Sequence, residues 1–312
     1  MHQLCTYFDA QYFLKGRALF HSLERHAGNF VLWVLCLDDI AYDLLVAMQD
    51  HRIRPVRLSE LESWEPRLAA AKSDRSLLEY FWTCTPTWLA YVLTRQNSGT
   101  WVSYLDADLY FFGPIDGIFE EAGGASVIIH GHRFAPENEY KSATSGVYNV
   151  GLTSFRNDEL GWQALRWWQT ACIAACYLRP DEGLCGDQKY LDDWPSRFEG
   201  VHVLQNLGAG LAPWNVNNYH FALVKDVLKV NSYPLVFYHF HAFQLLSSRL
   251  MGQRGYDVPD AVHRYVYRGY ARALQESLNE TRQLQPAFRA GFRRPPWREL
   301  FHDLRHRRYF WT

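Results

Sequence analysis

One stretch constrains this 312-residue chain more than any other: residues 101–112, WVSYLDADLYFF. Apolar residues lie on both sides of Asp106-Ala107-Asp108, and a run that contains Trp, Val and Tyr is typical of a buried strand. Two carboxylates one residue apart at the end of such a strand repel each other unless a cation lies between them. The stretch therefore predicts a divalent-metal site. The alternative is a turn in which the two aspartates cap backbone N–H groups.

The first sixty residues alternate between strand and helix patterns. Residues 3–8 and 30–37 are apolar runs that predict strands, and residues 11–26 between them have the apolar spacing of an amphipathic helix. A helix over residues 40–49 and a third strand over residues 53–58 continue the alternation. Runs that are apolar on both faces are typical of parallel strands covered by helices. The pattern predicts the α/β class, with ligands at the carboxyl ends of the strands.

The rest of the chain is less regular. Residues 59–93 have a mostly helical pattern, which we expect to break near Pro66 and Pro86. Residues 145–155 alternate like a strand, and Asn157 or Asp158 can cap a following helix that we expect to run through Tyr177. We expect one domain over residues 1–245 and a C-terminal helical, basic extension over residues 246–312.

The extension has two interpretations that the sequence leaves open. From residue 281 onward it contains eight arginines against one glutamate and one aspartate, together with several aromatic residues. Such a segment can lie on an anionic membrane surface, or it can pack as a helical hairpin against the core with its arginines in solvent. Pro295-Pro296 interrupts any continuous amphipathic helix, which favours the packed interpretation.

Composition excludes some classes of protein. The net charge of −1 offers no electrostatic argument for a nucleic-acid partner. The six cysteines are dispersed, there is no run of 18 apolar residues, and residues 1–20 lack a secretory signal pattern. We therefore expect a cytoplasmic protein with reduced thiols. The protein could be free in the cytoplasm or bound peripherally to the inner face of the membrane.

Two further clusters could complete a metal site. Tyr238-His239-Phe240-His241 follows an expected strand, and either imidazole could join the two carboxylates on one metal ion. Mixed oxygen and nitrogen ligation suits Mn²⁺ as well as Mg²⁺. The alternative is a pair of histidines with one in the core and one in solvent. Asp187-Gln188 offers a carboxylate and an amide that could hydrogen-bond hydroxyl groups, or an N-cap for the residues that follow.

Several short motifs occur together in the order in which a known enzyme family has them. They are the strand Cys5–Asp9, the helix Lys72–Tyr80, Asp106 with Asp108, Gly146–Gly151 with Asn149, Gly186-Asp187-Gln188, Trp214-Asn215 and His239-Phe240. Together they resemble the nucleotide-sugar-dependent glycosyltransferases with the GT-A fold. Within these, the chain is most similar to the retaining transferases of family 8, the lipopolysaccharide galactosyltransferase and glycogenin type. The resemblance covers residues 3–245 as spaced motifs.

This chain departs from the family pattern in two places. Residues 241–244, HAFQ, stand where the family has Lys-Pro-Trp, whose lysine contacts the diphosphate. Residues 148–151, YNVG, stand where the family has Asn followed by Ser or Ala and Gly. The chain therefore looks like a divergent member of the family. The resemblance implies transferase activity more directly than it implies retention of configuration at the anomeric carbon.

The resemblance implies a Rossmann-like GT-A domain, a Mn²⁺ or Mg²⁺ cofactor and a nucleotide-diphosphate sugar, with UDP as the expected nucleotide. It also implies transfer to a glycan or lipid-linked acceptor in bacterial surface-polysaccharide synthesis. The implied metal ligands are Asp106, Asp108 and His239. The implied nucleotide-sugar contacts are Thr6, Tyr7, Asp9, Arg75 and Asp106, and the implied catalytic or sugar-facing residues are Asn149, Asp187 and Gln188.

Three further points stay open at this stage. His132-Arg133 could add a diphosphate contact, although no family motif corresponds to it. A sugar nucleotidyltransferase or a sugar-nucleotide hydrolase is the alternative enzyme, but residues 9–17, DAQYFLKGR, lack the Gly-rich loop that such a nucleotidyltransferase usually has. A catalytically silent nucleotide-sugar binder is the alternative from another class.

Overall fold

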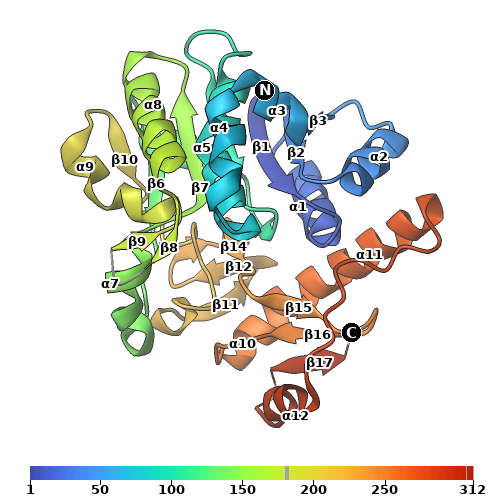
Figure 1. The fold of residues 1–312 in the computed structure, drawn as a ribbon. Helices are drawn as coiled ribbons and strands as arrows, with labels where there is room; N and C mark the ends of the chain where they lie inside the picture. Colours follow the sequence, from blue (N-terminus) through green and yellow to red (C-terminus); the bar gives the residue numbers. More distant parts are fainter. Residues whose placement is uncertain (180–182, 307, 312) are drawn as a thin grey trace.

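A computed structural model describes residues 1–179, 183–306 and 308–311. At its centre is a seven-stranded sheet in the order β10-β6-β7-β4-β1-β2-β3 (Figure 1). β7 runs antiparallel to both of its neighbours, and the other pairs are parallel. The strands are β1 (His2–Phe8), β2 (Phe30–Cys36), β3 (Ile53–Arg57), β4 (Trp101–Leu105), β6 (Val127–Gly131), β7 (Tyr148–Arg156) and β10 (Val201–Val203). The predicted α/β class and mostly parallel sheet are confirmed.

Helices cover both faces of this sheet because successive strand residues point to opposite sides. In β1, Leu4 belongs to one apolar cluster and Cys5 to the other. The first cluster takes in α1 (Phe13–His26), α2 (Asp39–Met48), α6 (Asp116–Ala122) and α11 (Arg268–Leu284). The second takes in α3 (Leu58–Trp64), α4 (Pro66–Ala71), α5 (Leu77–Leu93), α8 (Glu159–Ala174) and α9 (Trp194–Arg197).

Two helix boundaries differ from those expected. Pro66 is at the first turn of α4, where its missing N–H is harmless, but Pro86 lies inside α5 without ending it. α5 is buried along most of its length, and this packing outweighs the hydrogen bond that Pro86 cannot donate. Asp158 caps α8 by accepting a 2.9 Å hydrogen bond from the Gly161 N–H, and the helix ends at Ala174 rather than at Tyr177.

A short pairing below the main sheet positions the histidine of the expected metal site. β5 (Leu109–Phe111) follows Asp108 directly and pairs antiparallel with β14 (Phe237–His239). This register sets His239 opposite Leu109, next to Asp108. Other short elements near this region are a 3-10 helix η2 (Pro136–Lys141), α7 (Ser142–Ser145), β8 (Leu178–Arg179), β9 (Leu184–Cys185), η4 (Gln188–Asp193), η5 (Val216–Asn218), β11 (Phe221–Val224), β12 (Val227–Val230) and β13 (Tyr233–Pro234).

The C-terminal region contains strands that the sequence did not predict. β15 (Phe243–Leu245), β16 (Leu250–Gln253) and β17 (Tyr309–Trp311) form an antiparallel sheet, accompanied by α10 (Asp260–Val262), a π-helix (His263–Tyr267) and α12 (Trp297–Arg305). α11 packs against α1, and Glu280 accepts hydrogen bonds from Arg17 at 2.8 Å and from His21 at 2.9 Å. None of the helices in the described part of the chain has the length and apolarity needed to span a bilayer.

Candidate functional site

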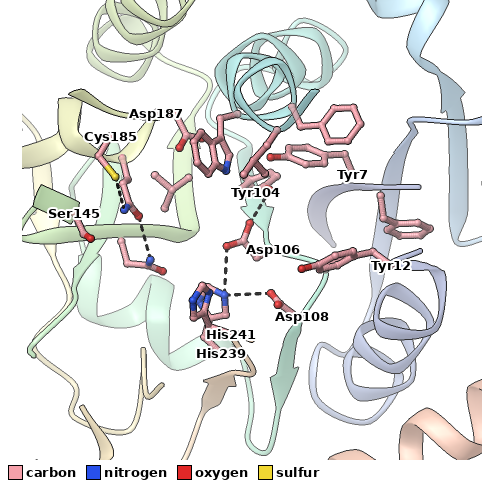
Figure 2. Close-up of a pocket in the computed structure, with 18 of the residues that line it drawn as sticks. Tyr7, Tyr12, Tyr104, Asp106, Asp108, Ser145, Cys185, Asp187, His239 and His241 are labelled. Carbon is pink, nitrogen blue, oxygen red and sulfur yellow. Dashed lines mark hydrogen bonds and ion pairs between the residues drawn. The ribbon is translucent and has the colours of Figure 1, made fainter. Parts of the chain in front are cut away.

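A cavity of about 680 Å³ lies at the carboxyl ends of β1 and β4. Its position agrees with the expectation that an α/β sheet binds ligands at this edge. Aromatic and aliphatic side chains make up much of its wall, and polar groups gather toward its centre (Figure 2). The predicted site residues that line it are Tyr7, Asp9, Asp106, Asp108, Asn149, Asp187, Gln188 and His239.

Two carboxylates and one imidazole meet in the middle of the cavity (Figure 2). The Nε2 atom of His239 lies 3.1 Å from Oδ1 of Asp108 and 3.6 Å from Oδ2 of Asp106. One potential ligand atom from each of the three residues lies within 4.8 Å of the other two. The structure thus brings together the three predicted metal ligands. His241 also lines the cavity but lies outside this group, with its ring centroid 6.0 Å from that of His239.

The charged groups of this cluster shift one another's pKa values. Burial raises the pKa of Asp106 above its usual range. Burial also opposes ionisation of Asp108, but His239 and Lys15 together hold its pKa well below the usual range. The two carboxylates raise the pKa of His239 despite its burial, and its Nε2 atom lies at hydrogen-bond distance from Asp108. A donor set of two carboxylates and one imidazole fits a divalent cation such as Mn²⁺.

Residues of strand β7 contact the metal-ligand cluster and hydrogen-bond with its backbone. The backbone N–H of Asp106 donates a 2.8 Å hydrogen bond to the carbonyl of Gly151, and the N–H of Gly151 donates to Oδ1 of Asn149 at 2.9 Å. A Cβ atom on Gly151 would lie 2.6 Å from that Asn149 oxygen and 2.9 Å from Nδ1 of His239. Glycine at this position therefore lets His239 and Asn149 approach the strand.

Lys15 is a site residue that the sequence reasoning missed. Its Nζ atom lies 3.5 Å from Oδ2 of Asp108, and both side chains are only 9% exposed. The same ammonium lies 4.1 Å from the ring centre of Tyr12, which lines the cavity. A lysine among the apolar residues of α1 was the one available signal, because a buried lysine usually has an anionic partner.

Asp187 also lines this cavity, and its pKa is higher than usual for an aspartate. Burial raises its pKa to about 7, and the nearby charge of Asp106 adds to this, while a hydrogen bond from Thr85 opposes it. Thr85 also lies within 3.4 Å of the Tyr7 hydroxyl. Next to Asp187, the side-chain oxygen of Gln188 lies 3.5 Å from the amide nitrogen of Asn149. The three predicted sugar-facing residues therefore share one wall of the cavity.

Two predicted nucleotide contacts are not brought to the cavity. The guanidinium of Arg75 donates a 2.7 Å hydrogen bond to the carbonyl of Ile173 at the end of α8 and lies over the ring of Tyr177. Thr6 is fully buried beside Tyr7, and its carbonyl accepts a 3.0 Å hydrogen bond from Trp88. Arg75 instead donates to a carbonyl at a helix end, and Thr6 lies further into the sheet than Tyr7, Phe8 and Asp9, which line the cavity.

The His132-Arg133 pair divides in a similar way. His132 lines the cavity, and its carbonyl accepts hydrogen bonds from Trp214 at 3.0 Å and from Asn215 at 2.8 Å. The guanidinium of Arg133 instead donates to the backbone carbonyl of Ala209, and the residue is only partly buried. The Trp-Asn motif therefore holds a cavity-lining loop in place, and Arg133 is not positioned to meet a ligand there.

Comparison with known proteins identifies relatives along nearly the whole chain. No family model matches the sequence. YfnD of Bacillus subtilis (strain 168), an uncharacterised protein, is 32% identical over 291 residues, which cover 92% of this chain and 93% of YfnD. YfnF of the same strain is 29% identical over 296 residues, which cover 91% of this chain and 95% of YfnF.

Among solved structures, the galactosyltransferase LgtC, crystallised with donor and acceptor sugar analogs, is similar in fold. It superposes with a TM-score of 0.53 at 12% identity, covering 88% of this chain and 95% of LgtC. At this identity the likeness establishes the fold and leaves the activity to be argued from the site. The chain belongs to the same family as YfnD, and its fold is the GT-A fold of LgtC.

Proposed function

We propose that this protein is a metal-dependent glycosyltransferase that moves a sugar from a nucleotide-diphosphate sugar to a glycan or lipid-linked acceptor. The observation that carries the proposal is the cluster of Asp106, Asp108 and His239 at the centre of the cavity. The GT-A fold and the order of the motifs along the chain add to it. UDP as the nucleotide and a role in bacterial surface-polysaccharide synthesis belong to the same proposal, and both rest on the family resemblance.

The difficult step is cleavage of the bond between the anomeric carbon and the diphosphate. Asp106, Asp108 and His239 would hold the divalent cation, and that cation, when bound, would neutralise charge that develops on the leaving diphosphate. At the carboxyl end of β1, Tyr7 and Asp9 line the cavity and would contact the nucleotide.

The polar wall of the cavity faces the sugar in this scheme. Asn149 and Asp187 would hydrogen-bond its hydroxyls, and the amide oxygen of Gln188 would stabilise an oxocarbenium-like carbon. Glutamate is absent from the described residues that line the cavity, which leaves no glutamate as a general base. We propose, on the family resemblance, transfer with retention, a reaction that needs no separate base because the leaving phosphate accepts the proton of the acceptor on the same face of the sugar.

Turnover of sugar nucleotides tests this proposal. UDP-, GDP- and dTDP-sugars are incubated with the protein and Mn²⁺, and release of the nucleoside diphosphate is measured, with water taking the sugar in slow hydrolysis when no acceptor is added. We expect release with one nucleotide class, and we expect both EDTA and Asp108→Ala to abolish it. Full activity of metal-stripped protein contradicts the proposal. Nucleotide binding that is independent of metal, without turnover, indicates the silent binder. Formation of the nucleoside triphosphate and sugar 1-phosphate when pyrophosphate is added indicates a nucleotidyltransferase.

We further propose that α12 contacts an anionic membrane surface, where a lipid-linked acceptor would lie. The acidic side chains of α12 turn inward, since Glu299 pairs with Arg293 at 2.6 Å and Asp303 pairs with Arg308 at 3.1 Å. We therefore propose the packed interpretation for α11 and the membrane interpretation for α12. α11 packs on the core, whereas α12 is anchored by its acids and leaves its other side in solvent.

The outward side of α12 is apolar and basic. Trp297 is 75% exposed, Phe301 is 66% exposed and Leu304 is 40% exposed, and their spacing of four and three residues places them on one face. Arg298 and Arg305, both exposed, lie beside that face, seven residues apart. Apolar and basic stripes side by side fit the boundary between acyl chains and anionic headgroups.

A further inference from the structure

The charges that line the cavity are unbalanced. Asp9, Asp106, Asp108 and Asp187 all line it, whereas Lys141 is the only lysine or arginine among its described lining residues. A nucleotide-sugar diphosphate carries negative charge of its own, and each phosphate oxygen that leaves water needs a cation or an N–H donor. A divalent cation held by the carboxylates can meet part of this need. Lys141 is the remaining cation within the cavity wall.

The ammonium of Lys141 is held in place but is not neutralised. It donates a 2.9 Å hydrogen bond to the hydroxyl of Tyr256 and lies 4.1 Å from the centre of that ring. Over the described ranges of the chain, no ion pair includes Lys141. In contrast, Lys15 pairs with Asp108 and Lys189 pairs with Asp192 at 2.7 Å. A phenol positions an ammonium without cancelling its charge, so Lys141 retains the capacity to bind an anion.

Aromatic contacts connect Lys141 to the metal-ligand cluster. The ring of Tyr256 lies 6.3 Å from that of His241, and His241 lies 6.0 Å from His239, measured between ring centroids. Lys141 ends η2 and Tyr256 precedes α10, so two segments 115 residues apart build this corner of the cavity. The corner thus lies on the His241 side of the cluster, at the point where the chain departs from the family's lysine motif.

We propose that Lys141, held by Tyr256, binds a phosphate oxygen of the donor diphosphate and supplies the cation that the segment after His239 lacks. The inference rests on the proposed function, because it assigns the diphosphate of that donor to this corner. Lys15 is not an equivalent candidate, since its ammonium is paired with Asp108 and is not part of the cavity wall.

Calorimetric titration of nucleotides into the full-length protein with saturating Mn²⁺ tests this assignment. The probe is whichever of UDP, GDP and dTDP binds the wild type most tightly, and the matching nucleoside is measured by competition. We expect Lys141→Met to weaken diphosphate binding by about tenfold or more, the value of one charge-assisted contact, and to leave nucleoside binding within about twofold. Lys141→Arg should recover most of the affinity, and Tyr256→Phe should give a smaller loss than Lys141→Met.

Lys189→Met is the matched control, because Lys189 lies near Ser142 beside the same wall but pairs with Asp192 outside the cavity. We expect this variant to bind the diphosphate like the wild type. Unchanged diphosphate affinity in Lys141→Met overturns the assignment. A variant that binds the diphosphate normally and has only a raised KM for the acceptor overturns it as well. An equal loss for nucleoside and diphosphate, or no recovery with Lys141→Arg, also overturns it. If the wild type binds none of the three diphosphates, the proposed function itself fails.

Discussion

Lys15 and Asp108 form a buried ion pair beneath the floor of the cavity, with Nζ 3.5 Å from Oδ2 and both side chains 9% exposed. The other oxygen of Asp108 faces His239 at 3.1 Å. One carboxylate therefore has a permanent cation on one side and a position for an exchangeable cation on the other. This arrangement keeps Asp108 ionised and oriented before any metal binds.

Replacing the lysine tests this account of Asp108. We expect Lys15→Met to lower the free energy of unfolding by roughly 3 kcal/mol in EDTA, near the low end for breaking a buried pair because His239 still pairs with Asp108. Saturating Mn²⁺ should recover a large part of the loss, since it compensates the same carboxylate. Urea unfolding with and without Mn²⁺ measures both values.

Lys72→Met serves as the control for that experiment, because Lys72 pairs with Glu62 at a site where the lysine side chain is 52% exposed. We expect a loss of less than about 1 kcal/mol there, independent of metal. An equal loss for Lys15→Met with and without Mn²⁺ would show that Lys15 only packs.

The pKa of Asp187, raised by burial to about 7, predicts a pH-dependent stability. Between about pH 4, where an unfolded aspartate ionises, and pH 7, the folded state holds a proton that the unfolded state releases. This contribution to stability is complete below about pH 4 and is lost as the pH rises through 7. Asp187→Asn has no carboxyl group to titrate at this position. Its free energy of unfolding, relative to that of the wild type, should therefore rise from pH 5 to pH 8 by on the order of a few kcal/mol. Thermal unfolding in EDTA at both values tests this, and a constant difference would contradict it.

A single methyl group at Gly151 should disturb the metal ligands. The added Cβ of Gly151→Ala would lie 2.9 Å from Nδ1 of His239, so the imidazole must shift. We expect a loss of about 1–3 kcal/mol in stability and a weaker affinity for Mn²⁺. Gly117→Ala is the control, because nothing lies within 4 Å of its added Cβ. Unchanged metal affinity in Gly151→Ala would show that His239 does not depend on this contact.

The outward face of α12 predicts binding to anionic lipid. We expect the full-length protein to float with vesicles that contain phosphatidylglycerol and to float much less with phosphatidylcholine alone. The double variant Trp297→Ser, Phe301→Ser should lose this binding by about tenfold or more. The matched double variant Leu223→Ser, Val224→Ser removes exposed apolar residues from β11 and should bind like the wild type. Equal flotation of the two double variants would contradict a specific role for α12.

The sequence predicted the parts of the fold that rest on strong local periodicity. The apolar runs of β1 and β2 and the amphipathic pattern of α1 are such signals, and the structure contains all three elements. Asp106, Asp108 and His239 could be grouped because each follows or ends an apolar strand. The pairing of β5 with β14 then completes the group through a register that no local pattern encodes.

Other features depended on contacts between distant segments and could not be read locally. Arg75 was expected in the site, but a carbonyl 98 residues away binds its guanidinium. Pro86 was expected to break a helix that tertiary packing keeps intact. Lys141 and Tyr256 come from segments without a periodic pattern, so only the folded chain reveals their contact.

The central claim is that Asp106, Asp108 and His239 together hold one divalent cation. Titration of Mn²⁺ followed by electron paramagnetic resonance measures this directly, without any donor or acceptor. We expect one ion per wild-type chain and an affinity weaker by about tenfold or more in Asp108→Asn and in His239→Asn. Asp116→Asn, which removes an exposed carboxylate paired with His2, should bind like the wild type. Equal affinity in the wild type, Asp108→Asn and His239→Asn would contradict the claim.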